Sequence, residues 1–212
     1  MKIVQQQLKE SQYYKEVTPK KILVLHHTVS GVGVAGDIAW WNKTPEKVGT
    51  PFIIDRTGVI YQVFDEKYWI HHLGIKQHLL TQFGSTVSNT RLNQLSIGIE
   101  IDSWGGLTRR DGKWYNTAAK VVPDCDVVQY PQGYRGYNAY ERYTPQQIQS
   151  VKELLIHLGK KHGISLKYNP DMWELNRRAL VGYHGVWSHT SYRPDKSDVH
   201  PQLELIEMLK SL

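Results

Sequence analysis

The chain has 212 residues, of which 40% are hydrophobic, and this is enough for one globular domain with a core of its own. Its single cysteine, Cys125, excludes an internal disulfide and a cysteine-rich zinc finger, so any metal must be held by histidine, aspartate or glutamate. The net charge of +6 comes from scattered basic pairs, whereas a nucleic-acid binder would more often show one dense basic stripe. We therefore expect no nucleic-acid partner. An anionic polymer and an ordinary basic surface both fit this charge.

The N-terminal residues 1–14 contain no apolar segment of the kind found in secretory signals. No apolar run in the chain approaches the length of a membrane-spanning helix. We therefore expect synthesis in the cytoplasm and no membrane partner, and we also expect a monomer. If the protein acts outside the cell, another component must release it.

Four segments in the first half have the short apolar runs or the alternation that are typical of β-strands: 22–26, 52–54, 59–64 and 95–102. Between the second and the third, residues 55–58 predict a hairpin turn, in which Gly58 can supply a positive φ. Residues 37–43 predict a short helix. In the segment 95–102 the isoleucines face one way, and Ser96, Gly98 and Glu100 face the other way.

The second half begins with a polar, glycine-rich and aromatic stretch at 103–142. We interpret it as a long surface insertion, and its many aromatic residues argue against disorder. It interrupts what we expect to be one domain over residues 1–212, since no linker, repeat or low-complexity tract divides the chain.

Helical signals follow the insertion. Thr144 is a suitable N-cap, with Pro145 in the first turn and Gln147 at the capping-box position, and the apolar spacing then continues up to Gly163. A last strand is predicted at 182–188. A terminal helix is predicted at 201–212, with its residues Leu203, Ile206 and Leu209 facing inward. Strands interspersed with helices predict an α/β fold with a central mixed β-sheet flanked by helices.

A few polar residues stand where chemistry is possible. His26 ends a buried strand, Glu100 lies on the small-residue face of another strand, and His189 and Asp198 flank a turn-rich loop. Catalytic zinc takes three such ligands and leaves one position for water, whose pKa it lowers to about 7. Each residue taken alone also fits an ordinary packed or solvent-facing position.

Spacing limits how these residues can be combined. His26 and His27 are neighbours on a strand and face opposite sides, so at most one of them can bind this metal, and the residues alone do not choose between them. Lys196 and Asp198 lie two residues apart and would point into the same pocket if the segment is extended. The nine-residue step from His189 to Asp198 requires the loop to fold back on itself.

These residues belong to segments that together resemble the type-2 N-acetylmuramoyl-L-alanine amidases, a family that includes phage amidase-type lysozymes, wall-recycling amidases and peptidoglycan recognition proteins. The resemblance covers nearly the whole chain except 103–142, and the joint match is specific. The matching segments occur in the family's order: Leu25-His26-His27-Thr28, 52–62, His72-Leu73-Gly74, 96–100, Tyr143-Thr144 with Gln147, and 188–201.

The resemblance implies a role for each residue at the site. One zinc ion per chain would be held by His26, His189 and Asp198, which selects His26 over His27. Glu100 would be the general base that takes a proton from the attacking water. Lys196 would stabilise the oxyanion of the tetrahedral intermediate. His72 would contact the substrate.

The sequence departs from the family pattern at three positions. Thr50 stands where some members have a tyrosine, so Glu100 should act as the base without it. Val199 stands in place of the proline after the last ligand, and Ser188 in place of a glycine. His184 is a spare candidate ligand that we expect to be structural.

The implied activity is hydrolysis of the amide bond between N-acetylmuramic acid and L-alanine in peptidoglycan or muropeptides. The expected role is that of a phage or prophage lysin that acts on the cell wall after release. A recycling amidase that acts on cytoplasmic muropeptides is an alternative. Two other classes stay open: a recognition module that binds without cutting, although such modules typically lack the third metal ligand, and an interaction protein that holds a partner through the aromatic insertion.

Overall fold

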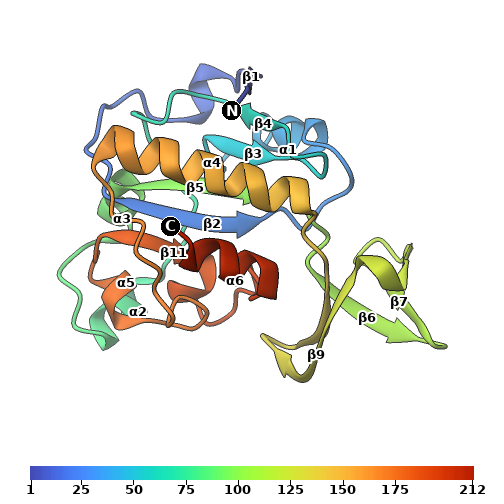
Figure 1. The fold of residues 1–212 in the computed structure, drawn as a ribbon. Coiled ribbons are helices and arrows are strands. Elements are labelled where there is room, and N and C mark those ends of the chain that lie inside the picture. The colour runs from blue at the N-terminus through green and yellow to red at the C-terminus, as the bar shows by residue number, and fades with distance from the viewer.

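A six-stranded mixed β-sheet forms the centre of the molecule in the computed structural model, which describes residues 1–212 (Figure 1). The strand order is β1-β4-β3-β5-β2-β11. Four strands run parallel to one another, and β4 and β1 run in the opposite direction. The bounds are β1 Ile3–Gln5, β2 Ile22–His27, β3 Phe52–Ile54, β4 Ile60–Gln62, β5 Ser96–Ile101 and β11 Gly185–Ser188. The sheet and its flanking helices confirm the predicted α/β fold.

Three adjacent parallel strands, β5, β2 and β11, bring candidate residues to one edge of the sheet. All six residues of β2 are buried, as the apolar run predicted, and β2 pairs with β5 on one side and β11 on the other. His26 lies opposite Glu100 in the parallel register. Because parallel strands end at the same edge, the last residues of β2, β5 and β11 converge there.

Helix α4, Pro145–His162, packs along one face of the sheet (Figure 1). It begins as predicted, since the Thr144 side chain accepts from the Gln147 N–H and the Gln147 side chain accepts from the Thr144 N–H. Gly163 ends it with a φ of 66°. Helix α6, Leu203–Lys210, packs against α4. The other face carries a smaller apolar cluster under α1, Ala35–Trp41, into which Ile53 points.

The terminal helix corrects one prediction. Leu203 was expected to face inward, but its side chain is 64% exposed. The buried positions of α6 are Leu205, Met208 and Leu209, whose spacing of three and four residues forms a single stripe toward the core. Leu203 lies in the first turn outside that stripe.

Several short elements were not predicted: β1, α2 (Gln77–Gln82), α3 (Asn89–Leu95), α5 (Arg177–Leu180), and single turns of 3-10 helix at Glu10–Gln12, Asp124–Asp126 and His189–Ser191. The remaining predicted elements are present with ends that differ by a few residues. None of the helices is long and apolar enough to cross a membrane.

The stretch 103–142 folds into a second sheet that projects from the main body (Figure 1). Its five antiparallel strands have the order β8-β7-β6-β10-β9, and we call them the β-lobe. Their bounds are β6 Gly106–Arg110, β7 Lys113–Tyr115, β8 Val121–Val122, β9 Val127–Tyr134 and β10 Tyr137–Glu141. The stretch is ordered, as its aromatic residues indicated, but its strands were not predicted. That the stretch is an insertion into a family domain stays a prediction.

One arginine ties both ends of the β-lobe to the main sheet. Arg56, in the turn between β3 and β4, donates from Nη1 to Asp102 Oδ1 at 2.7 Å and from Nη2 to Glu141 Oε2 at 2.8 Å. Asp102 directly follows β5, and Glu141 ends β10. The lobe is therefore held at its base by two charge-assisted hydrogen bonds.

Candidate active site

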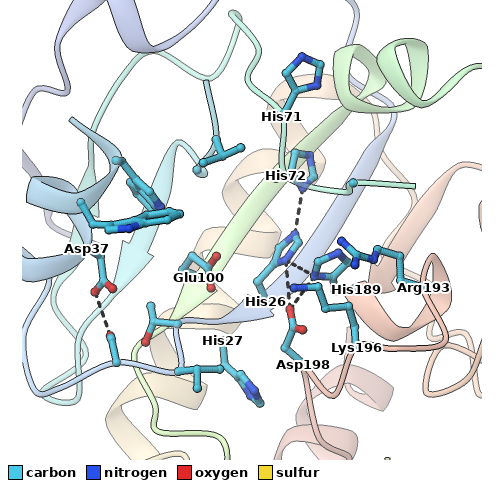
Figure 2. A pocket seen from close by; sticks show the side chains of 18 of the residues that line it. His26, His27, Asp37, His71, His72, Glu100, His189, Arg193, Lys196 and Asp198 are labelled. Atoms are coloured by element: carbon cyan, nitrogen blue, oxygen red, sulfur yellow. Dashed lines mark hydrogen bonds and ion pairs between the residues drawn. The ribbon is translucent and has the colours of Figure 1, made fainter. Parts of the chain in front are cut away.

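Three polar side chains meet at the carboxyl edge of the sheet (Figure 2). His26 Nδ1 lies 3.1 Å from His189 Nδ1 and 3.3 Å from Asp198 Oδ2, and His189 Nδ1 lies 2.8 Å from the same oxygen. All three residues are buried. A tetrahedral ion with ligands at about 2.0–2.1 Å sets those ligands roughly 3.3 Å apart, so the spacing fits zinc.

The loop between His189 and Asp198 does fold back. Thr190 N–H donates to the Asp198 carbonyl at 3.1 Å, which closes the loop on itself. The β-lobe holds it from outside: Tyr134 donates its hydroxyl to the Val199 carbonyl at 3.2 Å, and Arg135 Nη2 donates to the Thr190 carbonyl at 3.3 Å. The returned loop is therefore held both by its own backbone and by Tyr134 and Arg135 of the β9–β10 hairpin.

The hydrogen bonding of His189 suits a metal ligand. Its Nε2 lies 3.0 Å from the Leu73 carbonyl oxygen. A carbonyl can only accept, so Nε2 carries the proton and Nδ1 turns its lone pair toward the cluster. Metal-bound histidines are commonly oriented in this way by a backbone carbonyl.

The charge state of the cluster also suits a cation. Burial lowers the pKa of His26 to about 4, so this imidazole is neutral at pH 7. Burial alone would raise the pKa of Asp198, but its interactions with His189 and His26 hold it well below its usual value of 3.8. Neutral imidazole and ionised carboxylate are the forms that bind metal.

Glu100 stands beside this cluster without a partner. Its Oε2 is buried and makes no hydrogen bond. Burial raises the pKa of its carboxyl well above 4.5, and the negative charges of Asp198 and Asp37 act in the same direction. A carboxylate so placed binds a proton readily, which is the property of a general base.

The cluster lines a cavity of about 690 Å³. Glu100, His72 and Lys196 line it together with the cluster, as Figure 2 shows. His72 Nδ1 lies 2.9 Å from His26 Nε2, and His72 Nε2 lies 2.7 Å from Ser96 Oγ. The structure thus brings all six residues selected from the sequence to one place.

The neighbouring histidines are separated from the cluster. His27 is turned to the α4 side, where its Nδ1 lies 2.9 Å from the Tyr143 hydroxyl. His184 is exposed and lines a different cavity. Thr50 is buried and donates its hydroxyl to the Phe52 carbonyl, so it does not replace the missing tyrosine.

Among the other residues that line the cavity, sequence reasoning did not select Asp37, Trp40 or Arg193 as site residues. Trp40 is 59% exposed, whereas Trp41 is buried. The adjacent pair on a short amphipathic helix was a usable signal, because two successive helical residues cannot both face the core of such a helix. Asp37 and Arg193 carry no comparable signal.

Comparison with known proteins agrees with this fold. The structure resembles the N-acetylmuramoyl-L-alanine amidase LysC from Clostridium intestinale URNW (15% identity, TM-score 0.52, covering 98% of this chain and 95% of that one). It also resembles a mutant endolysin from Bacillus subtilis (17%, TM-score 0.55, 100% and 97%) and the catalytic domain of XlyA (18%, TM-score 0.54, 100% and 98%). No curated protein sequence matches the chain.

These identities are low, and the structural matches by themselves show the fold alone. The sequence profile of the family described as N-acetylmuramoyl-L-alanine amidase, however, matches residues 16–201, which include every residue of the site. The chain belongs to the N-acetylmuramoyl-L-alanine amidase family.

Proposed function

We propose that the protein is a zinc-dependent amidase that hydrolyses the bond between N-acetylmuramic acid and L-alanine in bacterial peptidoglycan. The observation that carries this proposal is the convergence of His26, His189 and Asp198, with Glu100 alongside, in a family that is named for this reaction. These three residues would hold one zinc ion per chain. When bound, zinc supplies a Lewis acid and makes water more acidic.

Other residues of the chain would carry out proton transfer, charge stabilisation and substrate contact. Glu100 takes the proton from the attacking water and passes it to the leaving alanine nitrogen, for which its unpaired oxygen is suited. Lys196 lines the same cavity and stabilises the negative charge that develops on the amide oxygen. His72 would meet the substrate through an edge or face of its ring, since both of its nitrogens lie against protein atoms.

We further propose that residues 1–212 form a single catalytic domain with an insertion at 103–142, that the protein acts as a monomer, and that its site of action is the cell wall, as for a phage or prophage lysin. A cavity of about 690 Å³ with an exposed tryptophan suits a polymer segment. Cleavage of this amide bond in intact sacculi would support a lysin. Hydrolysis restricted to soluble muropeptides would instead indicate wall recycling.

The test is a product analysis. Purified sacculi are digested with the protein, with the chelator-treated protein, and with the chelator-treated protein after zinc is restored. Mass spectrometry should show new L-alanine amino termini and free lactyl carboxylates in the first and third digests only. New reducing ends would indicate a glycosidase, and other amino termini an endopeptidase. Binding to sacculi without any cleavage would indicate a recognition module.

A further inference from the structure

A chain of hydrogen bonds leads from His26 away from the cavity. His26 Nε2 lies 2.9 Å from His72 Nδ1, and His72 Nε2 lies 2.7 Å from Ser96 Oγ. Ser96 begins β5 directly after helix α3, and its hydroxyl lies 2.8 Å from the Leu92 carbonyl oxygen. His26, Ser96 and Leu92 are buried and His72 is half-buried. Contacts this short along the series therefore each pair a donor with an acceptor.

The carbonyl at the end of this series of hydrogen bonds determines which atom carries each proton. The Leu92 carbonyl can only accept, so the Ser96 hydroxyl donates to it and accepts from His72 Nε2–H. A neutral His72 then has a bare Nδ1, which accepts from His26 Nε2–H. His26 is thereby left with its Nδ1 lone pair facing His189 and Asp198.

The same short segment orients the second histidine of the cluster. The carbonyl of Leu73, the residue after His72, accepts from His189 Nε2–H at 3.0 Å. The backbone here is held by one buried side chain: Asn93 Oδ1 accepts from the N–H of His72 at 2.7 Å and of Leu73 at 3.1 Å. Residues 72–73 therefore present one acceptor to each of the two imidazoles.

Strand β5 leaves room for the His72 ring. A Cβ on Gly98 would lie 3.1 Å from His72 Nδ1 and 2.5 Å from Thr50 Cγ2. The second distance is shorter than packed atoms tolerate, so a side chain here would displace its neighbours. The glycine of the motif at 96–100 thus lets the imidazole lie against the strand.

We propose that Ser96 and His72 are positioning residues that select the nitrogen His26 presents to the metal, and that Ser96 acts only through His72. This inference rests on the zinc site of the proposed function. It also gives His72 a role in the protein, whereas the sequence resemblance implied only contact with the substrate. Loss of such outer partners typically weakens metal binding about 10–100-fold.

The experiment measures the dissociation constant for zinc by competition with a chromophoric chelator. The variants are Ser96→Ala, His72→Phe, His72→Gln and the double variant Ser96→Ala/His72→Phe. Ser96→Ala and His72→Phe should each bind zinc about 10–100-fold more weakly. His72→Gln should bind more tightly than His72→Phe, because a glutamine oxygen can still accept from His26. The double variant should match His72→Phe alone.

Ser85→Ala is the matched control, since the Ser85 hydroxyl also donates to a carbonyl, that of Leu180, but touches no histidine. It should keep the wild-type zinc affinity. Melting temperatures of the metal-free variants separate a loss of fold from a loss of metal.

Three outcomes would overturn the inference. In the first, Ser96→Ala binds zinc as tightly as the wild type. In the second, Ser96→Ala weakens binding further in the His72→Phe background. Both leave the zinc site itself intact. In the third, the wild-type protein binds no zinc, and the proposed function then fails together with this inference.

Discussion

Replacing Glu100 by glutamine tests the role of its carboxylate in proton transfer with little change in side-chain packing. The side chains have nearly the same shape, and Oε2 of the glutamate has no hydrogen bond to lose. The change removes a group that can accept a proton in the cavity. General acid–base assistance is worth about 10²–10⁴-fold, so kcat should fall by that factor while zinc content is unchanged.

The same substitution should stabilise the metal-free protein. The pKa of Glu100 is raised by burial, so the folded state binds its proton more tightly than the unfolded state does. Wild-type stability therefore falls as pH rises from about 4.3 through the folded pKa, and a tenfold difference in proton affinity between the two states corresponds to about 1.4 kcal/mol. Glutamine has no proton to lose, so the variant lacks this fall.

Denaturant unfolding of both metal-free proteins between pH 4 and pH 8, together with lysis rates of the zinc-loaded proteins, tests both expectations. The stability difference should be smallest at pH 4 and grow with pH. A variant that binds zinc and lyses walls at the wild-type rate would remove Glu100 from the mechanism. A difference in stability that does not change with pH would mean that the carboxyl is not perturbed by burial.

Four further substitutions test other parts of the site. His26→Ala should abolish zinc binding and His27→Ala should keep one zinc per chain by elemental analysis, because only His26 lies in the cluster; the reverse pattern would exchange their roles. Lys196→Ala should keep zinc and lose on the order of 10²–10³ in the kcat of wall lysis, and a loss confined to KM would contradict an oxyanion role. Asp37→Asn should stabilise the metal-free protein by about 1 kcal/mol at pH 8 and by nothing below about pH 4. The reason is that burial raises the pKa of Asp37 to about 6, so its negative charge destabilises the folded state only where the carboxyl is ionised. A denaturant series in which the two proteins are equally stable at pH 8 would refute this.

Local signals in the sequence were sufficient for several elements. The run at 22–26 is typical of a buried strand, which the structure confirms, and alternation at 95–102 placed Glu100 opposite the isoleucines of its own strand. The start of α4 was readable because Thr144, Pro145 and Gln147 satisfy the first turn through neighbours in the sequence. The short helices α2, α3 and α5 were not predicted, although Ser88 and Asn176 cap α3 and α5, because each helix spans seven residues or fewer and depends on packing against the rest of the chain.

The candidate site, like the fold, was predictable from the sequence only in part. The sequence by itself determined which residue types could hold a metal, and alternation limited β2 to one histidine of the pair. It did not determine that His26 joins the cluster while His27 contacts Tyr143, because that depends on which side of the sheet each cluster of the core covers. Nor did it place Asp198 beside His189, because the return of their loop is held by Tyr134 and Arg135 from a sheet whose strands pair only with one another. Contacts between residues far apart in the chain decide such matters, and no local pattern encodes them.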